Sequence, residues 1–363
     1  MKDKFKNLEW EDKDGMFEIA LDKALEGKFQ DEHFPLLRVK NLCKYFPVYS
    51  KGFFKKQIGT IKAVDNISFD LMPGETLGLV GESGCGKTTA GRSILRAIDP
   101  TSGEVHFDTF TKLVDLCKIP EKKLKPLRTK MQMIFQDPYA SLNPRMTVRQ
   151  IVGEPLVIHS MAKGQELEDR VVEMLKKVGL KPEHRTRYPH AFSGGQRQRI
   201  GIARALIMHP SLVVCDEAVS ALDVSVQAQV INLLQDLQEE LGLTYIFIAH
   251  NLGVVKHICD NIAVMYAGRI VELAKADDLF KDPQHPYTKA LLSAVPSPDP
   301  DVPMNLALSG EVPDVSNLPD GCSFQSRCSV CTMECKEVKQ ELVKVGDGHF
   351  VACSLVKKKN GTE

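Results

Sequence analysis

A glycine-rich segment in the first quarter of the chain reads Gly81-Glu82-Ser83-Gly84-Cys85-Gly86-Lys87-Thr88. It fits the pattern G-x-x-x-x-G-K-[ST], in which glycines let backbone N–H groups turn inward around phosphate oxygens. The apolar run at 76–80 predicts a buried strand before it, and residues 89–95 predict a helix after it. The N-terminus of that helix adds partial positive charge. This context predicts a phosphate-binding loop.

Within this loop the side chains have different expected tasks. Lys87 would reach the β- and γ-phosphates of a nucleotide, and the Thr88 hydroxyl would ligate Mg²⁺. The expected nucleotide contacts in this segment are Gly81, Ser83, Gly84, Cys85, Gly86, Lys87, Thr88 and Thr89.

Bulk composition bounds the class of protein. The chain has 363 residues, 43% hydrophobic and 26% charged, which is ordinary for one large globular domain or two. Its formal net charge is zero, so nothing global suggests nucleic acid or an acidic membrane surface. No apolar run approaches the ~18–20 residues of a spanning helix. The acid-rich N-terminus is not a secretory signal, so we expect a cytoplasmic protein whose ten cysteines form no disulfides.

Strands that alternate with helices predict an α/β fold. Residues 36–71 predict a small β subdomain beside the nucleotide, and residues 137–190 predict a helical insertion. Apolar runs at 212–215 and 245–249 are typical of parallel strands buried on both faces. Further expected elements are a strand at 133–135, helices at 167–180, 195–208 and 226–241, and a hairpin of 262–266 with 270–274. Such a sheet binds its ligand at the carboxyl ends of its strands.

Both ends of the chain differ from this core. Residues 1–35 are charged and loosely amphipathic, which is typical of a surface helix on a flexible arm. From residue 282 prolines become frequent, and we expect irregular structure with one short helix at 287–295. The predicted organisation is an N-terminal extension at 1–35, a nucleotide-binding domain at 36–281 with a helical subdomain at 137–192, and a C-terminal module at 282–363.

Polar residues that follow the predicted strands indicate hydrolysis. Asp216 would hold Mg²⁺ through water, because Mg²⁺ keeps several waters. Glu217, one residue later, could orient and deprotonate an attacking water. His250 stands where a γ-phosphate contact is needed, and Gln136 could touch the metal and the water. Each residue is a weak signal alone, but the Asp-Glu pair becomes a strong one in a chain with a phosphate-binding loop.

A second glycine pair opens the helix predicted at 195–208. The segment reads Ser193-Gly194-Gly195-Gln196, and a helix N-terminus with two glycines is another anion-binding surface. One nucleotide does not need two such cradles from one chain. We therefore expect this segment to close on the γ-phosphate held by a partner chain.

In order and spacing these segments resemble an ABC-transporter ATP-binding subunit. The matching residues are the phosphate-binding loop, Gln136, 193–196, Cys215-Asp216-Glu217, Ser220-Ala221-Leu222-Asp223 and His250. The resemblance covers about residues 36–275. It implies a P-loop ABC cassette with a RecA-like core, an antiparallel β subdomain and a helical subdomain, and ATP sandwiched between two head-to-tail cassettes.

The same resemblance implies a role for each matching residue. Glu217 is implied as the general base, His250 as the γ-phosphate sensor and Gln136 as the contact to Mg²⁺ and water. Asp223 would link the two cassettes. An aromatic residue before the loop stacks on adenine in this family, and Phe46 (or Tyr45) matches that position.

Two further segments narrow the resemblance to the ATP-binding subunits of oligopeptide and dipeptide importers, especially the OppF/DppF type. They are Phe135-Gln136-Asp137-Pro138-Tyr139-Ala140-Ser141-Leu142-Asn143-Pro144-Arg145-Met146-Thr147 and His285-Pro286-Tyr287-Thr288-Lys289-Ala290-Leu291-Leu292. In that family the loop after Gln136 faces the membrane subunits. The chain departs from the pattern at Phe192, where leucine is usual, at Asn251, where aspartate is usual, and in the length of 1–35.

Five cysteines crowd into residues 322–353. Cys322, Cys328, Cys335 and Cys353 are spaced C-x₅-C-x₆-C-x₁₇-C, without the tight C-x₂₋₄-C pairs of structural zinc. Spacing alone leaves an iron–sulfur cluster, zinc and free buried thiols open. The segment resembles the C-terminal module of peptide importers, which binds a [4Fe-4S] cluster in some members. The resemblance implies such a cluster here, with Cys331 as an extra cysteine.

The resemblance as a whole implies an ATPase that drives uptake of oligopeptides or dipeptides, bound peripherally at the cytoplasmic face of the membrane. Its implied cofactors are ATP and Mg²⁺. Its implied partners are a second, related (OppD/DppD-like) ATPase subunit, two transmembrane permease subunits and an extracytoplasmic substrate-binding protein, with no nucleic acid. Whether the second cassette is identical or related stays open, and so does the transported substrate, which this subunit never touches.

Three alternatives remain at this point. The same family includes importers of nickel, glutathione or another small solute. A soluble mechanochemical ABC protein acting on ribosomes or DNA is a rival class, but such proteins carry two cassettes or long heptad insertions, and the sequence shows neither. A redox sensor built on the cysteines, with ATP hydrolysis secondary, is the third.

Overall fold

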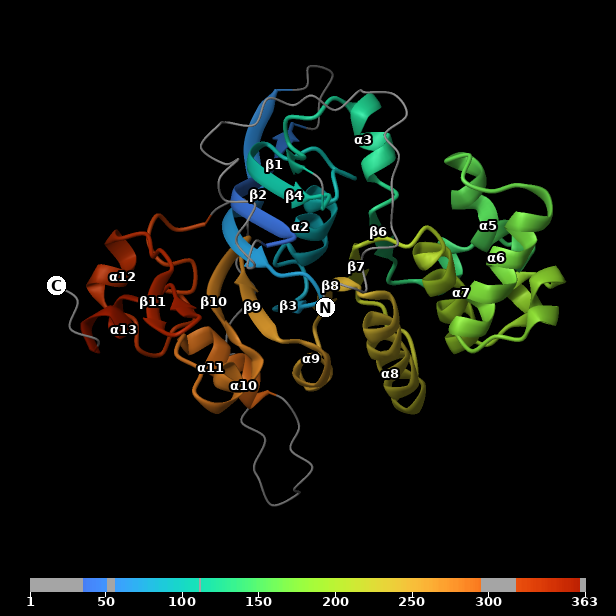
Figure 1. Ribbon diagram of the computed structural model, residues 1–363. Coiled ribbons are helices and arrows are strands. Elements are labelled where there is room, and N and C mark those ends of the chain that lie inside the picture. Colours follow the sequence, from blue (N-terminus) through green and yellow to red (C-terminus); the bar gives the residue numbers. More distant parts are fainter. Residues whose placement is uncertain (1–34, 51–55, 111, 295–317, 360–363) are drawn as a thin grey trace.

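The computed structural model describes residues 35–50, 56–110, 112–294 and 318–359, and the predicted extension at 1–35 lies almost wholly outside them. The described chain forms two sheets (Figure 1). The smaller, in spatial order, consists of β2 Gln57–Leu71, β1 Leu37–Tyr49, β4 Ser102–Asp108 and β5 Leu113–Asp115. The larger consists of β11 Val343–Gly346, β12 His349–Val351, β10 Arg269–Lys275, β9 Asn261–Tyr266, β3 Thr76–Val80, β8 Thr244–Ala249, β7 Leu212–Asp216 and β6 Met131–Ile134.

The centre of the larger sheet is parallel and buried on both faces. β3 pairs with β8, β8 with β7 and β7 with β6, all in parallel. Alternate residues of one strand enter two different hydrophobic clusters: Val213 packs with the helical side of the molecule, and Val214 packs with the smaller sheet. Because strand residues alternate between faces, both faces of the sheet are covered. The predicted α/β sheet is confirmed, and the carboxyl ends of its strands meet at one edge.

The smaller sheet is antiparallel and shares its core with the helix that follows β3. β1 pairs with β2 and with β4, and its residue Leu37 faces Leu71 and Phe107 across the two pairings. These residues pack with Ile94 of α2, the helix Lys87–Ile94. The predicted β subdomain is therefore confirmed, although β1 and β2 are longer than the sequence indicated.

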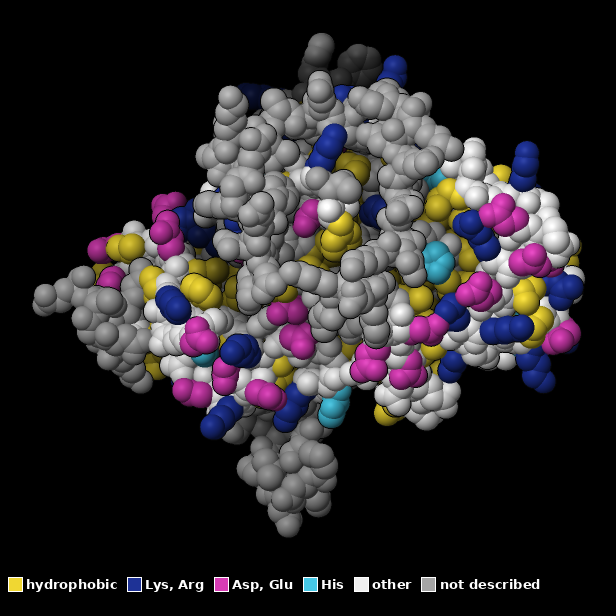
Figure 2. All heavy atoms as spheres, viewed as in Figure 1, with side chains coloured by type: hydrophobic (Ala, Val, Ile, Leu, Met, Phe, Trp, Pro, Cys, Tyr) yellow, Lys and Arg dark blue, Asp and Glu magenta, His cyan; other side chains and the backbone are white. Residues whose placement is uncertain are grey.

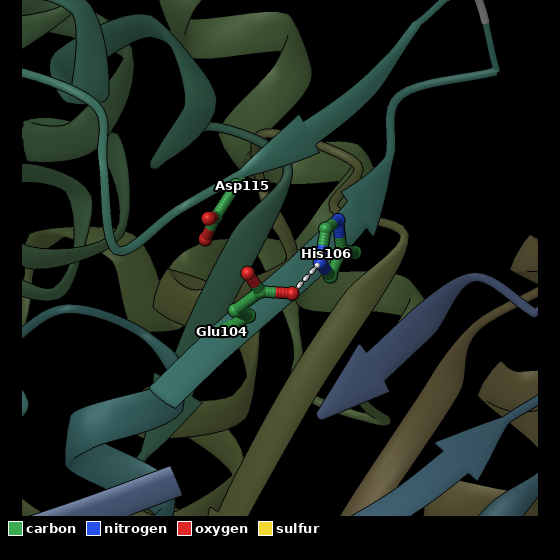
Figure 3. Close-up of side chains that lie close together, drawn as sticks. All are labelled: Glu104, His106 and Asp115. Atoms are coloured by element: carbon green, nitrogen blue, oxygen red, sulfur yellow. Dashed lines mark hydrogen bonds and ion pairs between the residues drawn. The ribbon is translucent and has the colours of Figure 1, made fainter. Parts of the chain in front are cut away.

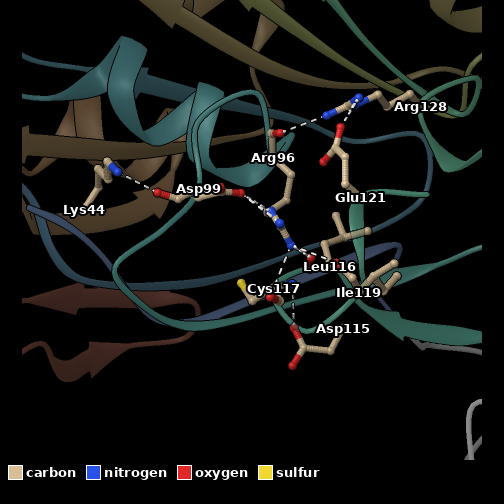
Figure 4. A network of polar contacts seen from close by, with 9 residues as sticks. All are labelled: Lys44, Arg96, Asp99, Asp115, Leu116, Cys117, Ile119, Glu121 and Arg128. Carbon is tan, nitrogen blue, oxygen red and sulfur yellow. Dashed lines mark hydrogen bonds and ion pairs between the residues drawn. The ribbon is translucent and has the colours of Figure 1, made fainter. Parts of the chain in front are cut away.

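The end of α2 is held by the polar network of Figure 4. Arg96 adopts a left-handed backbone conformation, φ 52°, and its guanidinium donates to the carbonyls of Cys117 and Ile119 at 3.2 and 3.3 Å. Asp99 pairs with Arg96 through its carboxylate and accepts from Lys44 Nζ through its carbonyl at 2.7 Å. The helix after the phosphate-binding loop is thereby tied to β1 and to the segment that follows β5.

Helices fill the predicted insertion and the remaining connections. Those of the insertion are α4 Pro138–Ser141, α5 Val148–Ile158, α6 Gly164–Lys177 and the 3₁₀ turns Pro182–Thr186 and Pro189–Ala191. α7 Gly194–Leu206 follows them and is the helix predicted at 195–208. The others are α3 Glu121–Leu127, α8 Val224–Leu241, α9 Leu252–Ile258, α10 Ala276–Lys281 and α11 Pro286–Ser293. α6 buries Leu167, Val171 and Met174 on one face, as its spacing predicted. A capping box of Thr147 with Gln150 begins α5.

The C-terminal segment corrects one expectation. Apart from one short helix, irregular structure was predicted after residue 282, but the structure also contains α12 Met333–Glu337, the hairpin β11–β12 and α13 Ser354–Lys359. β12 pairs with β10 of the large sheet, with Val351 opposite Glu272. The segment after 318 therefore extends the sheet of the nucleotide-binding core.

The surface carries charges of both signs. Figure 2 shows acidic and basic side chains interspersed over the helical insertion and over the C-terminal segment, as the zero net charge leads one to expect. Within the described ranges, no helix combines the length and the apolar character needed to cross a lipid bilayer.

Candidate nucleotide-binding and hydrolysis site

The phosphate-binding loop joins β3 to α2 and depends on glycine where the backbone comes close to other strands. A Cβ atom at Gly86, where φ is 106°, would lie 2.0 Å from the Ala63 carbonyl oxygen on β2. Lys87 is buried, and its Nζ donates to the carbonyls of Gly81 and Glu82 at 2.9 Å each. Burial raises the pKa of Cys85 although the Lys87 charge opposes the shift, so this thiol stays neutral. The loop is therefore closely packed, with its lysine lying against its own backbone.

Thr88 and Asp216, the predicted magnesium ligands, lie in contact. The Thr88 hydroxyl donates to Asp216 Oδ1 at 2.7 Å, and the Arg92 guanidinium lies 3.8 Å from Oδ2. Asp216 ends the buried strand β7, and burial raises its pKa despite the hydrogen bond from Thr88. A divalent cation beside this carboxylate would offset its desolvation. A hydroxyl and a carboxylate are also the oxygen ligands that Mg²⁺ prefers, so this pair fits the ion.

Glu217 receives contacts from both of the other predicted catalytic residues. Gln136 Nε2 donates to Glu217 Oε2 at 2.7 Å, and His250 Nδ1 lies 3.5 Å from the same oxygen. The three side chains follow β6, β7 and β8 at the edge where these strands end. Glu217 has a left-handed φ of 47°, which costs a non-glycine residue roughly 1–3 kcal/mol. The two neighbouring carboxylates thus contact different residues, Thr88 for Asp216 and Gln136 and His250 for Glu217.

The structure distinguishes the two candidate adenine contacts. The Tyr45 hydroxyl donates to Asp65 at 2.6 Å, and Asp65 also pairs with Arg269. Phe46, the next residue on β1, is exposed, and Lys44 Nζ lies 4.9 Å from its ring centre. Since Tyr45 is committed to a partly buried network, Phe46 is the ring available for stacking on a base.

The Ser193 segment lies apart from the phosphate-binding loop of the same chain. Ser193 and Gln196 form a capping box at the start of α7, and a Cβ atom at Gly195 would lie 2.5 Å from Val226 on α8. α7 packs on α4, α5, α6, α8 and β6, whereas α2 packs on β1, β2, β7 and β8. The structure therefore brings the phosphate-binding loop, Gln136, Asp216, Glu217 and His250 to one sheet edge and leaves Phe46 on β1 of the smaller sheet. Ser193 is exposed at the start of α7, which packs on the helical subdomain.

The two single-residue departures from the family pattern, Phe192 and Asn251, have a local explanation. Phe192 is buried, and its ring meets that of His184 edge-on at 5.2 Å, so the larger side chain fills the core of the insertion. The Asn251 side chain accepts from the Gly253 N–H at 2.9 Å and caps α9, a task that aspartate performs equally well.

The four predicted cysteine ligands share one pocket. It is lined by Cys322, Cys328, Cys335 and Cys353, with His285 and Phe324 among the neighbours, whereas Cys331 is not among its described lining residues. In the described chain no three of these sulfurs lie within 4.8 Å of one another. Tetrahedral zinc at ~2.3 Å from each sulfur requires sulfurs only about 3.8 Å apart. The four sulfurs are therefore spread more widely than a single four-coordinate zinc ion requires.

The four thiols differ in how readily they ionise. Burial raises the pKa of Cys322 to about 11. Burial also opposes ionisation of Cys335, but hydrogen bonds with Ser354 and Thr332 outweigh it and lower the pKa of this thiol. Cys335 is therefore the thiol of this pocket whose surroundings favour the thiolate form.

Another group of potential ligands, Glu104, His106 and Asp115, lies on β4 and β5 (Figure 3). His106 Nε2 lies 2.9 Å from Glu104. The Lys118 ammonium lies 3.1 Å from Glu104 and 3.0 Å from Asp115. The lysine thus already supplies the positive charge between the two carboxylates, and the group is an ion-pair network.

Comparison with known proteins gives a consistent result. The family model described as ABC transporter matches residues 64–220, and the model described as oligopeptide/dipeptide transporter, C-terminal region, matches residues 271–335. The oligopeptide transport ATP-binding protein AppF of Bacillus subtilis is 51% identical over 324 residues, which cover 88% of this chain and 97% of the relative. A putative peptide import ATP-binding protein of Brucella ovis is 50% identical over 320 residues, with the same coverage.

Solved structures agree with the fold. A dimeric ATP-binding cassette in a post-hydrolysis state, bound to ADP and Pi, is 28% identical with a TM-score of 0.57 and covers 66% of this chain and 98% of that chain. CbiO1 of Clostridium perfringens, described as part of an ABC transporter complex, is 29% identical with a TM-score of 0.57. The match covers 68% of this chain and 91% of that chain. The P-loop ABC cassette fold and its ATP-hydrolysing activity are thereby confirmed. The chain belongs to the ABC-transporter ATP-binding proteins of the oligopeptide/dipeptide transporter family.

Proposed function

We propose that this chain powers the import of peptides as one of two ATP-hydrolysing cassettes. Its nucleotide-binding domain would span 36–281, with the helical subdomain at 137–192, and 282–363 would form the C-terminal module of a peptide importer. The hydrolytic assignment rests above all on the contacts of Gln136 and His250 with the Glu217 carboxylate, beside the Thr88–Asp216 pair. The sequence of 1–35 is assigned no role.

Each residue around the sheet edge would have one role in nucleotide binding or hydrolysis. Lys87 and the loop N–H groups would bind the β- and γ-phosphates, and Phe46 would stack on adenine. Mg²⁺, bound by Thr88, Gln136 and Asp216, would neutralise charge that develops between these phosphates. Glu217 would take the proton of the attacking water, and His250 would contact the γ-phosphate. Water oxygen bonds to phosphorus while the bond to ADP breaks, which yields ADP and phosphate.

A second cassette would complete the site. Ser193, Gly194, Gly195 and Gln196 would reach the γ-phosphate held by the partner, since α7 lies apart from the loop of its own chain. Asp223 would join the two cassettes. A similar solved cassette is described as dimeric with ADP and Pi, which supports this arrangement. We favour a related OppD/DppD-like subunit over an identical copy as the partner.

The remaining partners would be two transmembrane permease subunits and an extracytoplasmic substrate-binding protein, with the chain bound peripherally at the cytoplasmic face of the membrane. Phe135 and Tyr139 are exposed at the start of the helical insertion, where the permeases would dock. The names of the relatives support peptides as the substrate.

The substrate class can be tested on the assembled importer in lipid nanodiscs with its binding protein. We expect ATP hydrolysis to rise when the binding protein carries oligopeptides or dipeptides. Stimulation by nickel or glutathione instead, with peptides inactive, would reject peptides and support the alternative within the family. Activity that needs no membrane subunits and responds to ribosomes or DNA would reject an importer altogether.

We also propose that the cysteine pocket holds a [4Fe-4S] cluster on Cys322, Cys328, Cys335 and Cys353. When bound, such a cluster would cross-link three segments that have little apolar sequence of their own. The wide spacing of the four sulfurs supports the cluster over zinc. Iron and sulfide analysis of anaerobically purified protein should give about four irons per chain. Cys322→Ser should abolish iron binding, whereas Cys331→Ser should leave it unchanged; zinc without iron would reject the cluster.

A further inference from the structure

Glu82, the second residue of the phosphate-binding loop, has every polar group engaged. Its N–H donates to the Tyr287 hydroxyl at 2.9 Å, and its carbonyl accepts from Lys87 Nζ at 2.9 Å. Its carboxylate accepts two hydrogen bonds from Arg327, at 2.7 and 3.0 Å. The carbonyl also accepts from the Cys85 N–H at 3.3 Å. Of these four partners, Tyr287 and Arg327 come from beyond residue 282.

The ion pair between Glu82 and Arg327 is shielded from water. The Arg327 side chain is only 4% exposed and that of Glu82 is 20% exposed. The guanidinium also lies about 6 Å from the ring centres of Tyr266 and Phe324. Bidentate, partly buried pairs have fixed geometry, and loss of one partner leaves an uncompensated charge. For Glu82 that charge would be negative and would lie in the loop that must bind phosphates.

The same contacts reach the cysteine pocket. Arg327 directly precedes Cys328, and Phe324, which lines the pocket, packs on Tyr287 with ring centres 5.4 Å apart. His285 lines the pocket too, and its Nδ1 accepts from the Tyr287 N–H at 3.0 Å. Each of the two side chains that hold Glu82 is therefore attached to a residue of the pocket wall.

We propose that Arg327 and Tyr287 are positioning residues that hold the phosphate-binding loop ready for nucleotide and couple it to the cysteine pocket. They touch Glu82 rather than the nucleotide, so they act through the conformation and charge of the loop. The coupling to the cysteine pocket rests on the proposed metal group, whereas the positioning of the phosphate-binding loop does not. By thermodynamic linkage, a group that orders the pocket tightens nucleotide binding, and bound nucleotide in turn protects the pocket.

The positioning role is tested by ADP affinity of the isolated chain, measured with a fluorescent ADP analogue. Arg327→Met should weaken binding about tenfold, and the ATP concentration for half-maximal hydrolysis should rise more than the saturated rate falls. Tyr287→Phe, which removes only one hydroxyl, should weaken binding by a smaller factor. The control is Arg38→Met, since Arg38 forms an equally bidentate pair with Asp70 on the smaller sheet; it should leave affinity within about twofold.

A double-mutant cycle separates positioning from general loss of stability. If Arg327 acts through Glu82, the variant that combines Glu82→Gln with Arg327→Met should bind ADP no more weakly than Arg327→Met alone. The proposal would be overturned if the losses of ADP affinity in the two single variants multiply in the double variant. It would also be overturned if Arg327→Met and Tyr287→Phe both bind ADP within twofold of the unaltered chain.

The coupling is tested with Cys328→Ser, with iron and zinc measured in each preparation. This substitution should weaken ADP binding in the unaltered chain and have no further effect after Arg327→Met. An equal effect in both backgrounds would overturn the coupling. If the unaltered chain is purified without bound metal, the proposed metal group and the coupling are rejected. The ADP affinity of Arg327→Met then decides the positioning role by itself.

Discussion

Glu217 illustrates how single residues set the chemistry of this site. Its φ of 47° breaks the strand geometry after Asp216, and its N–H donates to the Ile248 carbonyl on β8 at 3.0 Å, which fixes the turn. The carboxylate then lies within reach of Gln136 and His250 instead of the Thr88–Asp216 pair. Backbone strain at this position thus separates the proposed general base from the proposed metal ligand.

Glu217→Gln should lower ATP hydrolysis by a factor of roughly 10²–10⁴, because an amide cannot take the proton of the attacking water. Nucleotide affinity should persist, since Glu217 is not among the phosphate-binding residues. Phosphate release at saturating ATP measures the first quantity and a fluorescent nucleotide the second. Glu239→Gln, on the exposed face of α8, is the matched control, and an unchanged hydrolysis rate in Glu217→Gln would refute the base.

Asp216 should make magnesium-dependent binding sensitive to pH. Burial raises the pKa of this carboxyl, so at acid pH it holds a proton that Mg²⁺ must displace. The gain in ADP affinity on adding Mg²⁺ should therefore increase as pH rises through the acid range and then level off. Calorimetric titration between pH 5 and 8 measures it, and Asp216→Asn should abolish the gain. A gain that is constant with pH in the unaltered chain would contradict the assignment.

Residue types were largely predictable from sequence, but their partners were not. Asp216 and Glu217 were recognisable because they follow an apolar strand and a phosphate-binding loop stands upstream. Nothing in the spacing could show that Tyr45 is committed to Asp65 while Phe46 is exposed. Nor could it show that Arg327 meets Glu82, since that contact joins residues 245 positions apart.

At the scale of elements, a buried carboxylate joins three segments of the C-terminal half. Glu272 on β10 is fully buried and accepts from the N–H groups of Gln284 and His285 at 2.8 and 2.9 Å, just before α11. It also pairs with His349 of β12 at 2.8 Å. Burial opposes its ionisation, but these hydrogen bonds outweigh it and lower the pKa of Glu272.

Glu272→Gln should destabilise the chain by about 2 kcal/mol, because the side-chain NH₂ of glutamine would face a backbone N–H group of residue 284 or 285 in place of an accepting oxygen. The pH dependence has a definite sign: a carboxyl whose folded pKa is depressed stabilises the fold above its ordinary value of 4.5, and that stability is lost as pH falls below it. The difference between the variant and the unaltered chain should therefore shrink below pH 4.5. Urea unfolding at several pH values measures it, and a difference that grows on acidification would contradict the account.

Elements buried on both faces were the predictable ones. β3, β7 and β8 are apolar except for one polar residue at an end of each strand, because every residue in them is buried. β11 was missed because it is a short edge strand. Its alternate residues Lys344 and Gly346 are exposed, and neither is typical of a strand. α9 and α12 are too short to show a helical period in sequence.

At the scale of the whole molecule, the two phosphate-directed surfaces are separated by the fold. The phosphate-binding loop belongs to the sheet edge, and Ser193 belongs to the helical subdomain, packed on different elements. Under the proposed function a single chain would supply two different halves of a site, which is why we infer that hydrolysis needs a second cassette. The presence of two anion-binding segments in one sequence suggested two chains, but the separation of these segments could be seen only in the three-dimensional arrangement.

The most direct test is the rate of ATP hydrolysis per chain as a function of chain concentration, for this chain alone and mixed with the related cassette. The account predicts a rate that vanishes on dilution and rises to a plateau as the second cassette, of either kind, is added. Ser193→Arg in both cassettes should abolish the plateau. A rate per chain that stays constant down to concentrations at which light scattering finds only single chains would contradict it.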